Sequence, residues 1–250
     1  MVLPAVTLIV RSCGERTTEA CLRMLGRPAH LITGTPFSDT LRRAFERGIA
    51  EGRPYTVMVD ADVLPYLHLV PTLVESAEAD NSPWFEKHAL IFCKLFGRRG
   101  AGNRIYRTSL LPSALALLPR HADDERPETA IIQDMAVAGH SRAAIDTVVG
   151  LHGWEQDYRD IYRVAYVHAV KSRDRMAKYL PRWGKAALRG DRDFEVALIG
   201  ADAGARHEGP IAIDAGMFTW LEEQHKRPLG KWDSATVKAW KKAGRKPRGG

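Results

Sequence analysis

Short apolar runs alternate with segments of helical periodicity along the first half of the chain. Apolar runs predict strands at 6–10, 30–33 and 55–59, and helices are expected between them at 18–25 and 37–51. In the second helix the apolar positions Leu41, Ala44, Phe45 and Ile49 recur at three- and four-residue spacing. Strands and helices that alternate over short connections are typical of an α/β fold with a largely parallel sheet.

The same pattern continues less regularly through the second half. It predicts a helix starting at Leu64 and Pro65, a strand at 89–96, a helix ending near Leu118, a helix at 128–139 and a strand at 144–151. A long helix is expected at 158–180. Residues 194–201 suit either a strand or a helix, and 211–220 form a further element of undecided type.

Two carboxylates follow the third predicted strand, which is apolar throughout. Asp60 and Asp62 are separated by one small residue, so in extended backbone both side chains point to the same side. An unbroken apolar run suits a strand buried on both faces, and such strands deliver the following residues to the ligand-binding edge of an α/β sheet. Two oxygen ligands suit Mg²⁺ or Mn²⁺. The alternative is that Asp62 only caps a helix and Asp60 lies in a solvated turn.

Two polar segments are candidates for contacting phosphates. Residues 11–17 follow the first strand, and there Arg11, Ser12, Glu15 and Arg16 are candidate nucleotide-binding residues. Residues 97–104 are rich in glycine and carry Arg98 and Arg99, so this segment predicts a mobile loop over the site that contacts phosphates. A solvated hairpin turn is the alternative for residues 97–104.

Composition narrows the class of protein. The 250 residues carry a formal charge of +7, which indicates anionic partners such as nucleotides, nucleic acid or acidic lipids. The three cysteines have no metal-site spacing and indicate free thiols in a reducing compartment. The first apolar run is too short for a signal peptide, and no run is long enough to span a bilayer. A soluble cytoplasmic protein is expected.

The order of these motifs resembles the GT-A fold glycosyltransferases, nearest to the family-2-like group. The resemblance rests on the first strand and its polar turn, Asp60-Ala61-Asp62, Gln133-Asp134, Gly139-His140 and a strand ending in His152, and it covers about residues 6–152. It departs from the family pattern at Gln133, where an acidic residue is usual, and in the Arg-Ser-Cys-Gly-Glu-Arg turn. It implies a GT-A-type, Rossmann-like, mostly parallel sheet flanked by helices, with a helical C-terminal extension.

The resemblance also implies a reaction and roles for residues. A nucleoside-diphosphate sugar would donate its sugar to a hydroxyl of a glycan or lipid-linked acceptor, in surface polysaccharide or glycolipid synthesis. Asp60, Asp62 and His152 would hold Mn²⁺ or Mg²⁺, which stabilises the departing diphosphate. Asp60 would alternatively contact the ribose, and Asp134 would act as the general base of an inverting enzyme.

Two other functions are alternatives to the glycosyltransferase. A nucleotidyltransferase is the second hypothesis, although 11–17 has a single glycine where that class carries several. A non-enzymatic nucleic-acid-binding protein is the third, disfavoured because the positive charge concentrates in the tail.

We expect a catalytic core at 1–155, a helical part at 156–225 and a basic, partly disordered tail at 226–250. The tail would bind peripherally to the anionic inner face of a membrane.

Overall fold

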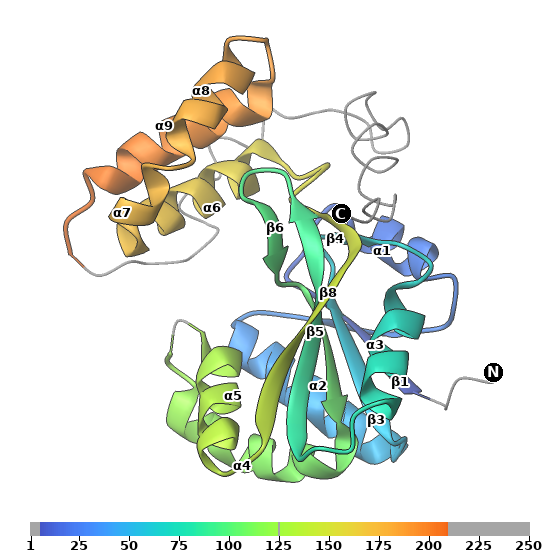
Figure 1. Ribbon diagram of the computed structural model, residues 1–250. Coiled ribbons are helices and arrows are strands. Elements are labelled where there is room, and N and C mark those ends of the chain that lie inside the picture. The colour runs from blue at the N-terminus through green and yellow to red at the C-terminus, as the bar shows by residue number, and fades with distance from the viewer. Residues whose placement is uncertain (1–5, 125, 210–250) are drawn as a thin grey trace. The chain divides into compact units, whose positions relative to one another are not determined.

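The computed structural model describes residues 6–124 and 126–209 (Figure 1). Within these residues the chain forms two compact units. The first unit contains residues 6–93 and 97–154, and the second contains residues 94–96 and 155–209. The predicted element at 211–220 and the predicted tail at 226–250 lie outside the described residues.

The first unit is built on an eight-stranded sheet. Its strand order is β2-β1-β3-β7-β5-β8-β4, and β6 pairs with β5. The strands are β1 (Val6–Ser12), β2 (His30–Thr33), β3 (Tyr55–Asp60), β4 (Val63–Pro65), β5 (Trp84–Cys93), β6 (Gly97–Gly100), β7 (Asn103–Arg107) and β8 (Ser141–His152). The pairs β1–β2, β1–β3 and β5–β8 are parallel, whereas β7 is antiparallel to both its neighbours. As a result β1, β2, β3, β5 and β8 all run in one direction.

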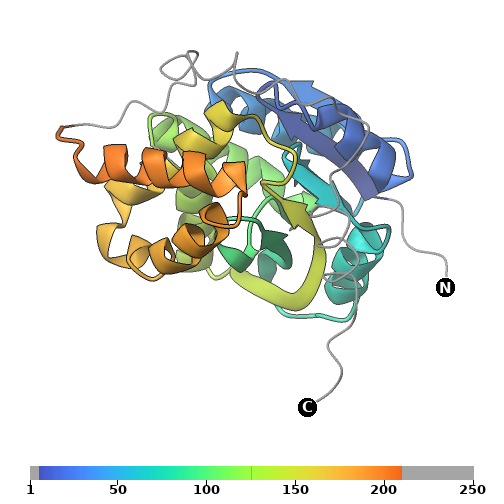
Figure 2. The same ribbon diagram turned by 90° about the horizontal axis from the view of Figure 1, so that it is seen from above.

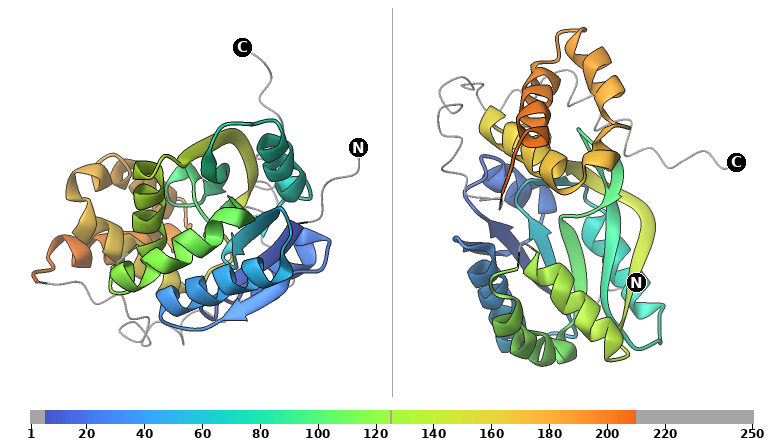
Figure 3. Two further views of the ribbon diagram at one scale, coloured as in Figure 1. Left: turned by 90° about the horizontal axis from the view of Figure 1, so that it is seen from below. Right: turned by 90° about the vertical axis from the view of Figure 1, so that its left-hand side faces the viewer.

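Helices cover both faces of this sheet, as the right panel of Figure 3 shows for α2 and α3. One face packs against α1 (Thr18–Leu25) and α3 (Leu69–Glu78), and the other against α2 (Phe37–Glu51), α4 (Leu111–His121) and α5 (Pro127–Val137), with the short helix η1 (Thr108–Leu110) before α4. Successive residues of β1 enter opposite cores, Leu8 and Val10 on one side and Ile9 on the other. This two-sided burial explains the unbroken apolar runs. The predicted fold class is confirmed.

The second unit is helical (Figure 2). Its helices are α6 (Tyr158–Lys171), α7 (Arg173–Met176), α8 (Leu180–Ala187) and α9 (Arg192–Ala205). Helices α6 and α9 pack closely because α9 presents glycines: a Cβ at Gly200 would lie 2.5 Å from the carbonyl oxygen of Tyr162, and one at Gly204 would lie 2.4 Å from that of Tyr166. Among the described residues, no helix is long and apolar enough to cross a membrane.

Two of the predicted elements in the first unit differ in the structure. The predicted helix start at Leu64 and Pro65 belongs to β4, an edge strand that pairs with β8. Proline, which has no N–H to donate, is tolerated on an edge strand. Residues 97–104 are not a loop: they form β6 and the start of β7, which return along β5. The strand bends at Gly102, and there the Asn103 side-chain amide bonds both backbone groups of Ala89 (2.9 and 3.1 Å).

The predicted helix at 158–180 is also divided. Helix α6 ends at Lys171, Ser172 leaves helical geometry with φ −150° and ψ 54°, and a new helix begins at Leu180 with Pro181 in its first turn. Proline is well accommodated there because the first helical N–H groups have no partner inside the helix. Residues 194–201, left open between strand and helix, lie in α9.

Candidate active site at the carboxyl edge of the sheet

The ends of two adjacent parallel strands, β1 and β3, are joined by backbone and side-chain hydrogen bonds. Arg11 and Asp60 are partners in the strand register, and the Ala61 N–H donates to the Arg11 carbonyl (2.8 Å). The Thr17 hydroxyl, buried in the loop after β1, donates to the Ala61 carbonyl (2.7 Å). The polar loop at 11–17 and the Asp60-Ala61-Asp62 turn therefore form one structural element, as expected where strands end side by side.

Arg11 fixes the Asp60 carboxylate. Its Nε and Nη2 atoms both donate to Asp60 Oδ1 (3.0 and 2.7 Å), while Nη1 donates to Glu128 Oε1 (2.5 Å) in the first turn of α5. The guanidinium is almost wholly buried, whereas a third of the Asp60 side chain stays exposed. Burial raises the pKa of Asp60; the Arg11 charge opposes that rise and the Asp62 charge adds to it.

Glu128 is the centre of a wider buried network. Tyr106 donates its hydroxyl to Glu128 (2.6 Å), and Arg104 bridges Glu128 (2.9 Å) and Glu86 (2.7 Å). Burial alone would raise the pKa of Glu128, but the charges of Arg104 and Arg11 lower it to about 2. Glu128 is therefore ionised at neutral pH, and its oxygens are taken by protein donors.

Asp62 lies beside His152, the last residue of β8. His152 Nε2 is 3.0 Å from Asp62 Oδ2, and the strand register aligns His152 with Cys93 on β5. Burial would lower the pKa of His152, but the Asp62 carboxylate and a hydrogen bond with Cys93 raise it well above the usual range. The raised pKa favours the protonated imidazole, which pairs with the Asp62 carboxylate at this edge of the sheet.

Glu15 shapes the loop after β1. Its carboxylate accepts hydrogen bonds from the Ser12 hydroxyl and the Cys13 N–H, both at 2.7 Å. Burial is the main cause that raises the pKa of Glu15, and the nearby Asp62 charge adds to it. Arg16 is half-buried in the same loop. Four of the predicted nucleotide-binding residues, Arg11, Ser12, Glu15 and Arg16, thus lie next to Asp60 and Asp62.

Gly102 brings backbone close to Asp60 and to His152, the partner of Asp62. The Asp60 N–H donates to the Gly102 carbonyl (2.8 Å), and a Cβ at Gly102 would lie 2.5 Å from Val63 Cγ2 and 3.6 Å from His152 Cδ2. Its φ of +67° lies in the left-handed region, where glycine is favoured. Space and backbone conformation both require glycine at this position.

The predicted metal site does not fit the arrangement of its three residues. Asp60 Oδ1 is held by Arg11, and the His152 nitrogen that would bind a cation faces Asp62 as a hydrogen-bond partner. Within residues 6–124 and 126–209, no group of three or more histidine, cysteine, aspartate or glutamate side chains could hold a metal ion. The structure brings Asp62 and His152 together, but as an ion pair.

Two other predicted site residues, Asp134 and Arg98, are engaged by partners other than Asp60 and Asp62. Asp134 accepts hydrogen bonds from His121 (2.9 Å) and Arg120 (3.4 Å) of α4, and the His121 hydrogen bond lowers the pKa of Asp134, which makes it a weaker base. Arg98 extends from β6 to Asp146 of β8 (2.8 Å). Arg99 is half-buried on β6, opposite Ile91. Asp134 is six residues beyond Glu128, or about 9 Å along the helix axis.

Glu128 and Tyr106 were not predicted as site residues from the sequence, and Arg104 was predicted only as part of the phosphate-contacting segment 97–104. Two signals pointed to them: Glu128 follows Pro127 at a helix start, where an acidic residue is favoured, and Arg104 and Tyr106 alternate with Ile105 along a strand. Neither signal identifies the partners, because the contacts to Arg11 and Glu86 join segments far apart in the sequence.

No family model and no curated protein sequence matches the chain. Solved structures with a similar backbone include a glycosyltransferase involved in glycosylation of the major capsid of PBCV-1 (11% identity, 60% of this chain, 93% of that chain, TM-score 0.43). They also include 2-C-methyl-D-erythritol 4-phosphate cytidylyltransferase from Thermus thermophilus (14%, 58%, 89%, 0.42). A third is glucosyl-3-phosphoglycerate synthase from Mycobacterium tuberculosis, in complex with Mn²⁺, UDP and phosphoglyceric acid (11%, 60%, 70%, 0.37). These are partial likenesses of backbone, so the function has to be argued from this chain's own residues.

Proposed function

We propose that this protein is a glycosyltransferase that takes a sugar from a nucleoside diphosphate and passes it to a hydroxyl acceptor. The proposal rests on one observation: hydrogen bonds join the loop after β1 to the Asp60-Ala61-Asp62 turn at the carboxyl edge of the sheet. Ligands of α/β sheets bind at this edge. A partly exposed pair of carboxylates beside a polar loop suits the hydroxyls of a ribose and a sugar.

Asp60 is the proposed contact to the ribose. Both hydrogen bonds from Arg11 end on Oδ1, so Arg11 orients the carboxylate without binding Oδ2. A fixed carboxylate oxygen can accept hydrogen bonds from the vicinal hydroxyls of a ribose. In this role Arg11 and Glu128 are positioning residues, because they act through Asp60.

Asp62 and His152 are the proposed contacts to the diphosphate and the transferred sugar. His152, whose pKa Asp62 raises, would supply positive charge at the edge where the diphosphate would lie, and such preorganised charge favours a leaving group that gains negative charge. Asp62 holds the ring through Nε2, and its carboxylate can accept a hydrogen bond from a hydroxyl of the sugar. The general base is not assigned to Asp134 in this proposal, because its carboxylate is engaged by α4.

Thermal stability against a panel of nucleotides and nucleotide sugars tests the proposal. A ligand that binds only the folded state raises the melting temperature by mass action. We expect a rise with one nucleoside diphosphate and its sugars, reduced in Asp60→Ala and Asp62→Ala and retained in the control Asp202→Ala, whose exposed carboxylate pairs with Arg206. Each titration is run with Mn²⁺, with Mg²⁺ and with a chelator, so that a metal requirement is measured directly.

The second arm measures the reaction. Release of a nucleoside diphosphate from the stabilising nucleotide sugar, lost in Asp62→Ala, would support the transferase. Release of pyrophosphate from a nucleoside triphosphate and a sugar phosphate would instead show that the protein is a nucleotidyltransferase. Stabilisation by no nucleotide, or by one that Asp60→Ala and Asp62→Ala leave unchanged, would overturn the proposal.

A further inference from the structure

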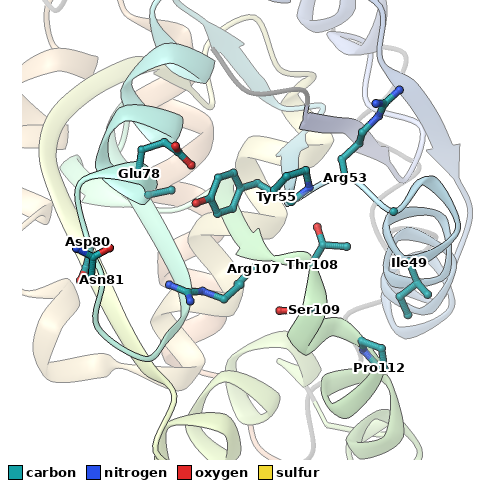
Figure 4. A pocket seen from close by; sticks show the side chains of 13 residues that line it. Ile49, Arg53, Tyr55, Glu78, Asp80, Asn81, Arg107, Thr108, Ser109 and Pro112 are labelled. Atoms are coloured by element: carbon teal, nitrogen blue, oxygen red, sulfur yellow. The ribbon is translucent and has the colours of Figure 1, made fainter. Parts of the chain in front are cut away.

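A cavity lies at the opposite edge of the same sheet. It has a volume of about 710 Å³ and lies where β3 begins and β7 ends, between the ends of α2 and α3 (Figure 4). Tyr55 and Arg107, which line it, are partners in the β3–β7 register. Tyr55 is five residues from Asp60 along β3, so the cavity is about 17 Å from the carboxyl-edge site.

The carboxylates that line the cavity already have partners. Asp80 binds Lys87 Nζ (2.7 Å) and accepts from the Ser82 N–H (2.9 Å). Glu78 forms a hydrogen bond with the Tyr55 hydroxyl; burial first, and then this bond, raises the pKa of Tyr55 to about 12. The two negative charges of the lining are therefore compensated or engaged within the protein.

Arg107 is in the opposite condition. Its guanidinium stacks on the Trp84 ring (4.8 Å) and donates one hydrogen bond, from Nη2 to the Ser82 carbonyl (3.2 Å). Its Nε is buried and makes no hydrogen bond to any residue that the structure describes. Figure 4 shows this side chain extending toward Asp80 and Asn81, with the Ser109 hydroxyl nearby and Arg53 directed away.

We propose that this cavity binds a small oxyanion-bearing ligand, a phosphate or a carboxylate, through the Arg107 guanidinium. A planar guanidinium held by stacking matches the spacing of two oxygens on such a group. The structure shows one hydrogen bond from Arg107 to the described residues, so the other terminal N–H groups of the guanidinium remain to bind the oxygens of such a group. Ser109 and Asn81 supply further donors to the same group.

The site is independent of the proposed sugar transfer, since it shares no lining residue with the carboxyl edge. The test is calorimetric titration of the full chain with two probes, inorganic phosphate and acetate. We expect binding of one or both at millimolar concentration, weakened about tenfold or more in Arg107→Gln. Arg206→Gln, which removes an equally positive but exposed side chain, should bind as the wild type does.

Two further variants guard against misfolding of Arg107→Gln. Ser109→Ala alters an exposed side chain of the lining and should weaken binding severalfold. Glu78→Gln removes a negative charge but keeps an oxygen for Tyr55, so it should strengthen binding of either anion. Asp62→Ala should bind the probes normally, which separates this site from the nucleotide site. No binding of either probe, or binding unchanged in both Arg107→Gln and Ser109→Ala, would overturn the proposal.

Discussion

An arginine lies near each end of the β3–β7 strand pair, and the two arginines differ in their burial and in their charged partners. At the carboxyl end, Arg11 of the adjacent strand is buried and shared between Asp60 and Glu128. At the amino end, Arg107 stacks on Trp84 and has no carboxylate within ion-pair distance among the described residues. Arg11 cannot leave its partners without depriving the buried Glu128 and the partly exposed Asp60 of their shared cation, so it orients a site. Arg107 keeps donors available, so it can receive a ligand.

Removing the buried charge should have the largest effect. Arg11→Gln leaves Asp60 and Glu128 without their shared cation, and breaking a buried ion pair typically costs about 3–5 kcal/mol. We expect a loss of that size in the free energy of unfolding, measured by urea denaturation. The matched control is Arg42→Gln on the surface of α2, whose exposed pairs with Asp39 and Glu46 are screened by solvent, so this variant should lose far less stability. Equal losses in both variants would contradict the role of Arg11.

Adding one methyl group at the carboxyl edge should have the next largest effect. Gly102→Ala places a Cβ 2.5 Å from Val63 at a φ of +67°, whereas Gly139→Ala has a φ of +93° and nothing within 4 Å. Both substitutions strain the backbone, but only the first crowds the site. Overpacking typically costs about 1–3 kcal/mol, so Gly102→Ala should lose that much more stability than Gly139→Ala. It should also reduce nucleotide-induced stabilisation; identical behaviour of the two variants would rule out a steric constraint at Gly102.

Acid should lower the stability of the folded protein in part by protonating Glu128. Its pKa in the folded protein is about 2, below that of an unfolded glutamate, so its contribution is complete above the unfolded value of about 4.3. The contribution is lost as the pH falls from there through about 2. Urea unfolding between pH 5 and about 2.5 should therefore lose less stability in Glu128→Gln than in the wild type. Glu46→Gln, at an exposed pair, should follow the wild-type slope.

The smallest effect is expected at the amino end. Arg107→Gln removes a stacked cation and one hydrogen bond to a backbone carbonyl, and an exposed cation–π contact contributes about 0.5–1 kcal/mol. Urea unfolding without added anions should register a loss of that order. Adding phosphate should widen the difference between the wild type and Arg107→Gln, because only the wild type gains a ligand. A loss as large as that of Arg11→Gln would show that both arginines are structural.

Local pattern was enough to predict the architecture of the first unit. The apolar runs at β1 and β3 and the three- and four-residue spacing in α2 follow directly from burial on a sheet or a helix face. Pattern failed at Pro65 and at residues 97–104, where strand pairing overrode the local signal for a helix start and for a loop. A residue such as Gly102 suits a loop and a bent strand equally well until its neighbour β5 is known.

The candidate site divides in the same way. The Asp60-Ala61-Asp62 turn and its position after a buried strand were readable from the chain, and so was the end of β8 at His152. Asp134 was assigned as the general base from the resemblance in motif order, and motif order says nothing about which side of a helix faces the sheet. In the structure Glu128 reaches Arg11, 117 positions away in the sequence, whereas Asp134 faces α4.

The sequence by itself determined which segments are buried and which polar residues follow the strands, because both depend on neighbours along the chain. Only the tertiary structure decided the state of each charge: Asp60 held by Arg11, Asp62 paired with His152, and Arg107 stacked on Trp84. The physical reason is that electrostatic and hydrogen-bond energies depend on distance and burial. Those are fixed by contacts between strands that meet only when the sheet forms.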